Sequence, residues 1–90
     1  MNTNLNDFQY STMVEGEIRP IRFEPKMIDN TLAFHVVPVE TPNYDFTMKS
    51  VGKQWKIQNT KLPEWILEME QMFHKMIGAE IGKLTLNKLA

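Results

Sequence analysis

The sequence predicts an α+β domain, a five-stranded antiparallel meander followed by one C-terminal amphipathic helix packed across one face of the sheet. Three observations lead to this fold class. Apolar residues alternate with polar ones through the first two thirds of the chain, which is the period of a half-buried strand. In the last third they recur at steps of three and four, the period of an amphipathic helix. Turn residues separate the alternating runs at short intervals, so consecutive strands should be neighbours in the sheet.

The first two strands are predicted to form a hairpin around the turn Glu15-Gly16. A two-residue turn at this point determines the register of the whole ladder. Phe8 then faces Phe23 across the two strands. Large apolar cross-strand pairs of this kind stabilise a sheet, so the pairing supports the hairpin independently of the turn.

The later strands are delimited by three further groups of turn residues. Pro25 and Asp29-Asn30 bracket a short connection, Glu40 to Asn43 form a turn, and Gly52-Lys53 form a second hairpin turn. The second hairpin places Met48 opposite Ile57 on the buried face, together with Trp55. Strands are therefore expected over roughly 7–14, 17–24, 31–39, 44–51 and 54–59.

A helix is expected from about residue 61 to residue 78 or 82. Pro63 suits its first turn, and Gly78 or Gly82 is a suitable stop. The following tail, 83–90, is expected to be a loose end or a short extra strand. The predicted apolar stripe consists of Leu62, Trp65, Ile66, Met69, Met72, Phe73, Met76 and Ile77.

Seven methionines in 90 residues are an unusual feature of the composition. Met48, Met69, Met72 and Met76 are expected to point into one layer, which predicts a methionine-rich core. Methionine is flexible enough to fill irregular gaps, and the same property suits an adaptable groove for a peptide or a lipid. A core role is the simpler interpretation of the two.

Composition indicates one domain over residues 1–90, with a polar N-terminal tail at 1–6. The net charge of −1 argues against a nucleic-acid partner and gives no electrostatic reason to bind an anionic membrane. The chain has no cysteine and no apolar run long enough to cross a bilayer, and its polar first residues lead us to expect no signal peptide. We therefore expect a cytoplasmic protein without disulfides.

Few residues are candidates for chemistry. His35 could act as a general base with Asp45 or Tyr44, although a solvated strand histidine is the more ordinary interpretation. His74 follows Glu70 by one helical turn, but two ligands are too few for a zinc site. No nucleotide-binding or catalytic motif is present. We therefore expect no metal, no cofactor and no enzymatic activity.

A coverage argument predicts a homodimer. Five strands span roughly 20–24 Å, whereas one helix with its side chains is only about 10–12 Å across. The third strand is also apolar on both sides, and such strands usually have both sides covered. Patches left uncovered on a monomer are commonly buried by a second copy. The predicted interaction surface consists of Met13, Ile18, Val37, Val39 and Leu67.

Three hypotheses for the function follow. The leading one is a small non-enzymatic protein-interaction module that self-associates. The alternative is a small carrier that holds an apolar ligand between the sheet and the helix. The third is an enzyme with a site near His35.

Overall fold

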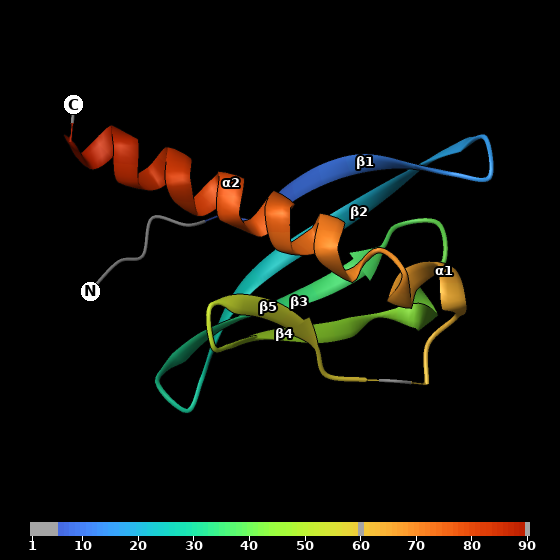
Figure 1. Cartoon of the computed structure of the whole chain (residues 1–90), viewed down its shortest axis with the longest axis horizontal. Helices are drawn as coiled ribbons and strands as arrows, with labels where there is room; N and C mark the ends of the chain where they lie inside the picture. The colour runs from blue at the N-terminus through green and yellow to red at the C-terminus, as the bar shows by residue number, and fades with distance from the viewer. Residues whose placement is uncertain (1–5, 60, 90) are drawn as a thin grey trace.

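The computed structural model describes residues 6–59 and 61–89, with side chains as far as residue 83. It confirms the predicted class, an α+β fold in which an antiparallel meander of order β1-β2-β3-β4-β5 carries a C-terminal helix (Figure 1). The polar tail predicted at 1–6 lies almost entirely outside the described residues. The strands are β1 (Phe8–Val14), β2 (Glu17–Ile28), β3 (Thr31–Pro38), β4 (Phe46–Val51) and β5 (Gln54–Ile57).

The first hairpin forms in the predicted register. Glu15 and Gly16 both have positive φ, 50° and 81°, as a turn that matches the twist of the strands requires. Phe8 lies opposite Phe23 as expected, and their rings stack with centroids 4.9 Å apart. The turn chemistry alone was therefore sufficient to place these two strands.

Strand β2 is longer than predicted and runs through Pro25 to Ile28. The predicted connection from Pro25 is wrong, because the turn consists of Asp29-Asn30 alone, both with positive φ. Proline is tolerated where no ladder bond is needed. The carbonyl of Pro20 faces β3, so by alternation Pro25 faces the β1 side. Strand β1 begins only at Phe8, opposite Phe23, so no donor is required at Pro25.

Strand β4 begins later than predicted. Pro42–Tyr44 form a single turn of 3-10 helix, η1, and the strand starts at Phe46 rather than at residue 44. Pro42 is at the start of this turn, where the missing N–H costs nothing. The Tyr44 N–H bonds to the Thr41 carbonyl at 3.0 Å, which closes the turn.

The hairpin of β4 and β5 matches its prediction. Met48 lies opposite Ile57 and Ser50 lies opposite Trp55. Gly52 has a φ of 65° in the turn, a conformation that an ordinary side chain rarely adopts. Trp55 packs against Phe34 edge-on, with centroids 5.0 Å apart, so its ring lies on the helix side as expected.

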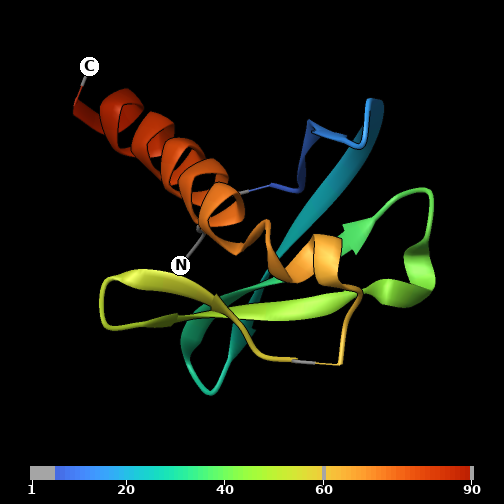
Figure 2. The ribbon, with the colours of Figure 1, turned by 45° about the vertical axis from the view of Figure 1, so that its right-hand side comes forward.

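The predicted continuous helix is interrupted. It consists of a single turn, α1 (Glu64–Leu67), and a long helix, α2 (Glu70–Leu89), that leaves in a different direction (Figure 2). The N–H of Met69 bonds to the carbonyl of Ile66, only three residues back, at 3.0 Å. This tightened turn separates the two pieces and lets both Ile66 and Phe73 enter the core.

The predicted helix end is also wrong, because α2 continues past Gly78 and Gly82 to Leu89. A glycine stops a helix by adopting positive φ, and neither of these glycines does so. Each costs only about 1 kcal/mol inside a helix. The intervening Glu80 is held by Tyr10 of β1 at 3.0 Å and by Lys83 at 2.9 Å, so this part of the helix is anchored.

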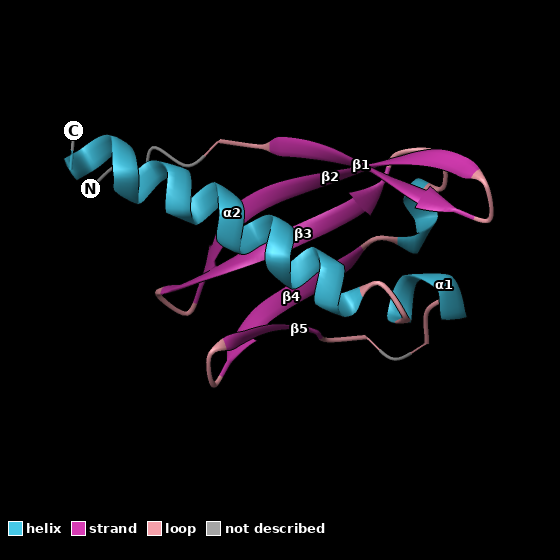
Figure 3. Ribbon diagram, turned by 45° about the horizontal axis from the view of Figure 1, so that its top comes forward, coloured by secondary structure: helices cyan, strands magenta, loops and turns pink. Residues whose placement is uncertain are grey.

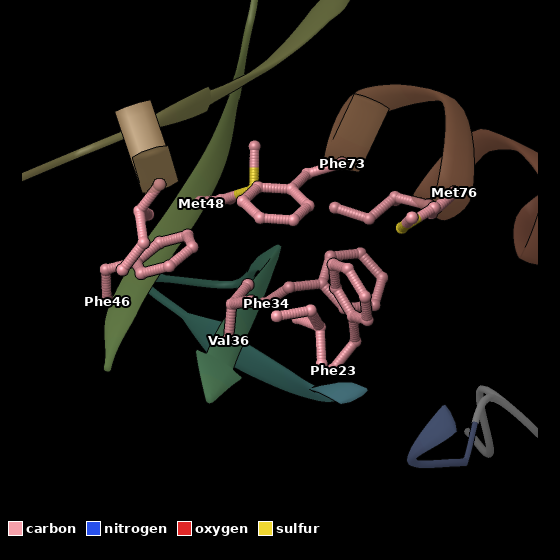
Figure 4. Packing of buried hydrophobic residues seen from close by; sticks show 10 residues of the cluster. Phe23, Phe34, Val36, Phe46, Met48, Phe73 and Met76 are labelled. Atoms are coloured by element: carbon pink, nitrogen blue, oxygen red, sulfur yellow. The ribbon is translucent and has the colours of Figure 1, made fainter. Parts of the chain in front are cut away.

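The core lies between the sheet and the two helices. Phe73 and Met76 of α2 point toward Phe23, Phe34 and Met48 of the sheet (Figure 4). Phe73 is fully buried, and its ring lies 5.9 Å from that of Phe23 and 5.7 Å from that of Phe46. Ring contacts at these distances and tilted angles are favourable.

The methionine-rich core is not supported. Met48 and Met76 are buried and Met69 packs against the core, but Met72 is 47% exposed. Met13 and Met27 are exposed as well. Met72 lies about 100° around α2 from the fully buried Phe73, at the margin of the buried stripe, so its side chain remains largely in solvent.

Helix α2 crosses the strands rather than running along them (Figure 3). Near its start it contacts β5, and one turn beyond Met76 it reaches β1 through Glu80. Among the described residues, neither helix combines the length and the apolarity needed to cross a bilayer.

The burial of Phe73 predicts a large stability difference between neighbouring positions of α2. A Phe73→Ala variant should lose about 3–5 kcal/mol of unfolding free energy, because it leaves a cavity among packed rings. A Met72→Ala variant is the matched control and should lose well under about 1 kcal/mol, because that side chain is exposed. Urea unfolding followed by circular dichroism measures both. Equal losses would show that α2 presents a different face to the sheet.

Candidate functional site

A chain of charged and polar side chains crosses the sheet face opposite α2, here called the back face. His35 of β3 bonds through Nδ1 to Oε1 of Glu24 at 2.9 Å and through Nε2 to Oδ2 of Asp45 at 2.7 Å. The other oxygen of Glu24 accepts a bond from Nε of Arg22 at 3.0 Å. One imidazole thus links β2, β3 and the segment just before β4.

Local structure explains how these groups meet. The two-residue turn Asp29-Asn30 sets the register of β2 and β3 and places Glu24 directly opposite His35. The 3-10 turn η1 ends at Asp45, which brings that carboxylate beside the ring. The sequence predicted Asp45 or Tyr44 as a partner of His35, and only Asp45 contacts it. Glu24 was missed, although the register of a hairpin around Asp29-Asn30 would have revealed it.

Both contacts favour the charged imidazole. Hydrogen bonds to Asp45, followed by those to Glu24, raise the pKa of His35 above its ordinary value, and partial burial opposes them only in part. The bond from His35, followed by that from Arg22, lowers the pKa of Glu24. A ring that serves two carboxylate acceptors must donate from both nitrogens, and only the protonated form can do so.

This arrangement is poorly suited to catalysis. Each ring nitrogen of His35 already faces a carboxylate oxygen, so neither nitrogen is free to take a proton from a substrate. The described residues contain no group of three side chains that could hold a metal ion. The network is best described as a polar link across three neighbouring segments of the sheet.

The predicted interaction surface is only partly exposed. Met13 is 63% exposed, Ile18 is 65% exposed and Val39 is 39% exposed. Met13 and Ile18 are cross-strand partners in the β1–β2 hairpin, and both lie on the back face. Val39 is beside them, because its N–H bonds to the carbonyl of Pro20 at 3.1 Å. These three residues are here called the hairpin patch.

Two of the predicted surface residues lie elsewhere. Val37 is only 6% exposed, so it does not contribute to a free surface. It is opposite Arg22 and two residues from His35, and the stems of such long polar side chains can cover an apolar neighbour. Leu67 is half-buried in α1. Its neighbour Ile66 belongs to the core, so Leu67 is on the helix side of the sheet.

The outer edge of β5 is capped by α2. The N–H of Trp55 donates to Nδ1 of His74 at 3.1 Å, and the N–H of Ile57 donates to Oε2 of Glu70 at 2.9 Å. The sequence indicates Glu70 and His74 only as a pair one helical turn apart. Instead each accepts a backbone N–H of the edge strand, which is one way in which proteins block unwanted strand addition.

The outer edge of β1 has no such cap among the described residues. The carbonyl of Pro20 faces β3, where it accepts from Val39. Backbone groups alternate in direction along a strand, so Ser11, opposite Pro20, directs its N–H and C=O away from β2. By the same alternation Gln9 and Met13 do likewise. The two edges of this sheet therefore differ: side chains of α2 accept the outward N–H groups of β5, whereas the outward groups of β1 have no such partner among the described residues.

A hollow of about 160 Å³ opens beside the β2–β3 turn. Asp29 and Leu32 line it on one side, and Lys49 and Ser50 of β4 line it on another. No residue of α2 lines it, although Leu32 also packs against the core. Its lining mixes charged, polar and apolar groups.

Comparisons with known proteins found no relative of this chain. No family model, no curated protein and no solved structure matches it. The functional argument therefore rests on the geometry of the chain itself.

The His35 network predicts a stability that depends on pH. Because the pKa of His35 is raised, its contribution is fully present below the ordinary histidine pKa and is lost as the pH rises through the raised value. Between about pH 6 and about pH 9, the native chain should lose roughly 1 kcal/mol more unfolding free energy than a His35→Gln variant. Urea unfolding at both pH values measures this difference. Parallel pH profiles of the two chains would contradict the prediction.

The cap on β5 predicts a local effect on hydrogen exchange. A Glu70→Ala variant leaves the N–H of Ile57 without its acceptor, so that amide should exchange about tenfold faster. A Glu68→Ala variant is the control, because Glu68 is exposed and bonds to no strand. Amide exchange followed by NMR measures both. Unchanged exchange at Ile57 in the Glu70 variant would show that the edge is protected by another group.

Proposed function

We propose that this protein is a non-enzymatic interaction module that self-associates as a homodimer through the β1–β2 hairpin. The observation that carries the proposal is the hairpin patch. Met13 and Ile18 are paired neighbours, each more than 60% exposed, on the sheet face opposite α2 (Figure 3). Paired apolar side chains in solvent at the free end of a hairpin are a common feature of protein contact surfaces.

The surroundings of His35 favour this proposal over the enzyme hypothesis. A general base must reach a substrate with a free lone pair, whereas both nitrogens of His35 face carboxylates within 2.9 Å. The network also joins strands that the fold needs to hold together. A stabilising role is therefore sufficient to account for it.

The close packing of aromatic rings in the core favours the proposal over the carrier hypothesis. A carrier needs an apolar space that a ligand can enter. Between the sheet and α2, the aromatic rings of Phe23, Phe34, Phe46 and Phe73 contact their neighbours at centroid distances of about 5–6 Å. The absence of cysteine suits a reducing compartment, so we propose that the module acts in the cytoplasm.

The proposal predicts a mass that depends on concentration. Light scattering and sedimentation across the micromolar range should show a monomer that converts to a dimer. A Met13→Thr, Ile18→Thr variant keeps residues that favour strands but removes apolar area, so its dimer should dissociate about tenfold more readily. A Met27→Thr, Met72→Thr variant changes exposed methionines elsewhere and should behave as the native chain does. A monomer at every concentration would refute the proposal. Equal effects of the two variants would show that the β1–β2 hairpin is not the dimer interface.

A further inference from the structure

We infer that the partner is a second copy of this chain whose β1 pairs antiparallel with β1 of the first, giving one continuous ten-stranded sheet. The inference rests on the proposed self-association and adds its geometry. The two-fold axis is perpendicular to the sheet and passes midway between Ser11 and Ser11 of the second copy. The starting point is the difference between the two edges, because β5 is capped by Glu70 and His74 whereas β1 has no cap among the described residues.

The backbone of β1 is complementary to itself in this arrangement. Gln9, Ser11 and Met13 direct their N–H and C=O groups outward. With Ser11 opposite Ser11 of the second copy, Gln9 faces Met13 in both directions. Each of the three facing pairs can exchange two hydrogen bonds, about six in all. No other register of the seven-residue strand uses all three outward residues of both copies.

The side chains of β1 fit the same register. The strand contains no charged residue, no proline and no glycine. Exposed edges usually carry a lysine, a proline or a bulge that discourages pairing, and β1 has none of these in its residues. Across the axis, Tyr10 faces Thr12 and Phe8 faces Val14 on the helix side. Aromatic residues beside β-branched ones are favourable cross-strand neighbours.

The cap on β5 limits the assembly to two copies. A sheet with two open edges can keep adding strands, whereas the described residues leave only the edge of β1 without a cap. When the β1 edges of two copies meet, the two remaining edges are both β5, and each is occupied by its own Glu70 and His74. The assembly is therefore closed, as in a two-fold dimer.

Helix α2 provides a second reason to expect a copy beyond β1. Glu80 contacts Tyr10 of β1, yet the helix continues from there to Leu89. Nine more residues extend it by about 13 Å, nearly three strand spacings. Figures 1 and 3 show these last turns extending past the start of β1, beyond the described strands of the sheet. The strands of the second copy would lie there, with both α2 helices on the same side of the joined sheet.

A Ser11→Lys variant tests the edge directly. Ser11 is exposed, so the change should leave the fold and its thermal unfolding unaltered. In the paired dimer it places two like charges opposite each other, which should raise the dissociation constant at least about tenfold. A Ser50→Lys variant is the matched control, because Ser50 is also exposed but lies in β4, away from the β1 edge.

A cysteine provides a second test that does not depend on weakening the dimer. The chain has no cysteine, so a Ser11→Cys variant contains a single thiol. Facing residues on the axis have Cα atoms about 5.5 Å apart, within disulfide range. Oxidation should yield the covalent dimer in high yield, and a Ser50→Cys control should not.

The outcomes separate this inference from the proposed function. A native dimer that is lost in Ser11→Lys and linked through Ser11→Cys supports both. A native dimer that persists in Ser11→Lys, or that fails to form the disulfide, overturns the edge geometry while self-association stands. A native chain that remains monomeric at high concentration overturns both.

Discussion

The structure depends on how one long helix, α2, covers the apolar face of a five-stranded sheet. A helix about 10–12 Å across cannot cover a sheet of roughly 20–24 Å by lying along its strands. α2 therefore crosses them (Figure 3). Phe73 fills the middle of the core, His74 accepts a backbone N–H of β5 on one side, and Glu80 holds Tyr10 of β1 on the other. The core, the capped edge and the overhanging helix end all follow from this crossing.

The same constraint leaves the back face without a covering layer. Apolar side chains there must be covered by their neighbours, and Val37 and Ala33 are indeed buried, at 6% and 1% exposure. Their neighbours on the face are the linked polar side chains of Arg22, Glu24 and His35. Because those side chains hydrogen-bond to one another, this part of the face does not require a second protein to cover it. On this face the exposed apolar side chains are those of the hairpin patch, at the end of the sheet that the network does not reach, and that of Val51 in β4, which is 57% exposed.

Most of the strand order and register could be predicted, because two-residue turns determine pairing by simple counting. Glu15-Gly16 and Gly52-Lys53 placed every partner in their hairpins, and the same counting around Asp29-Asn30 would have placed Glu24 beside His35. The break at Met69 could not be predicted, because it depends on how Ile66 and Phe73 reach the core together. The contacts of Glu70 and His74 with β5 were equally inaccessible, because they require the helix axis to be known. Glycine alone was a misleading signal for the helix end.

The distribution of charge bears on which surface is available for contact. Strands β2, β4 and β5 all carry basic or acidic residues, among them Arg22, Lys49 and Lys56. Strand β1, whose outer edge has no cap in the part of the chain that the structure describes, carries none. A monomer would be protected by a single lysine on that edge at almost no cost to the fold, since Ser11 is exposed. An uncharged edge is a hazard unless another strand occupies it. The cap on β5 prevents unwanted strand addition at one edge of the sheet, and pairing of β1 with β1 of a second copy would prevent it at the other. A closed dimer therefore accounts for the capped edge and for the uncharged edge.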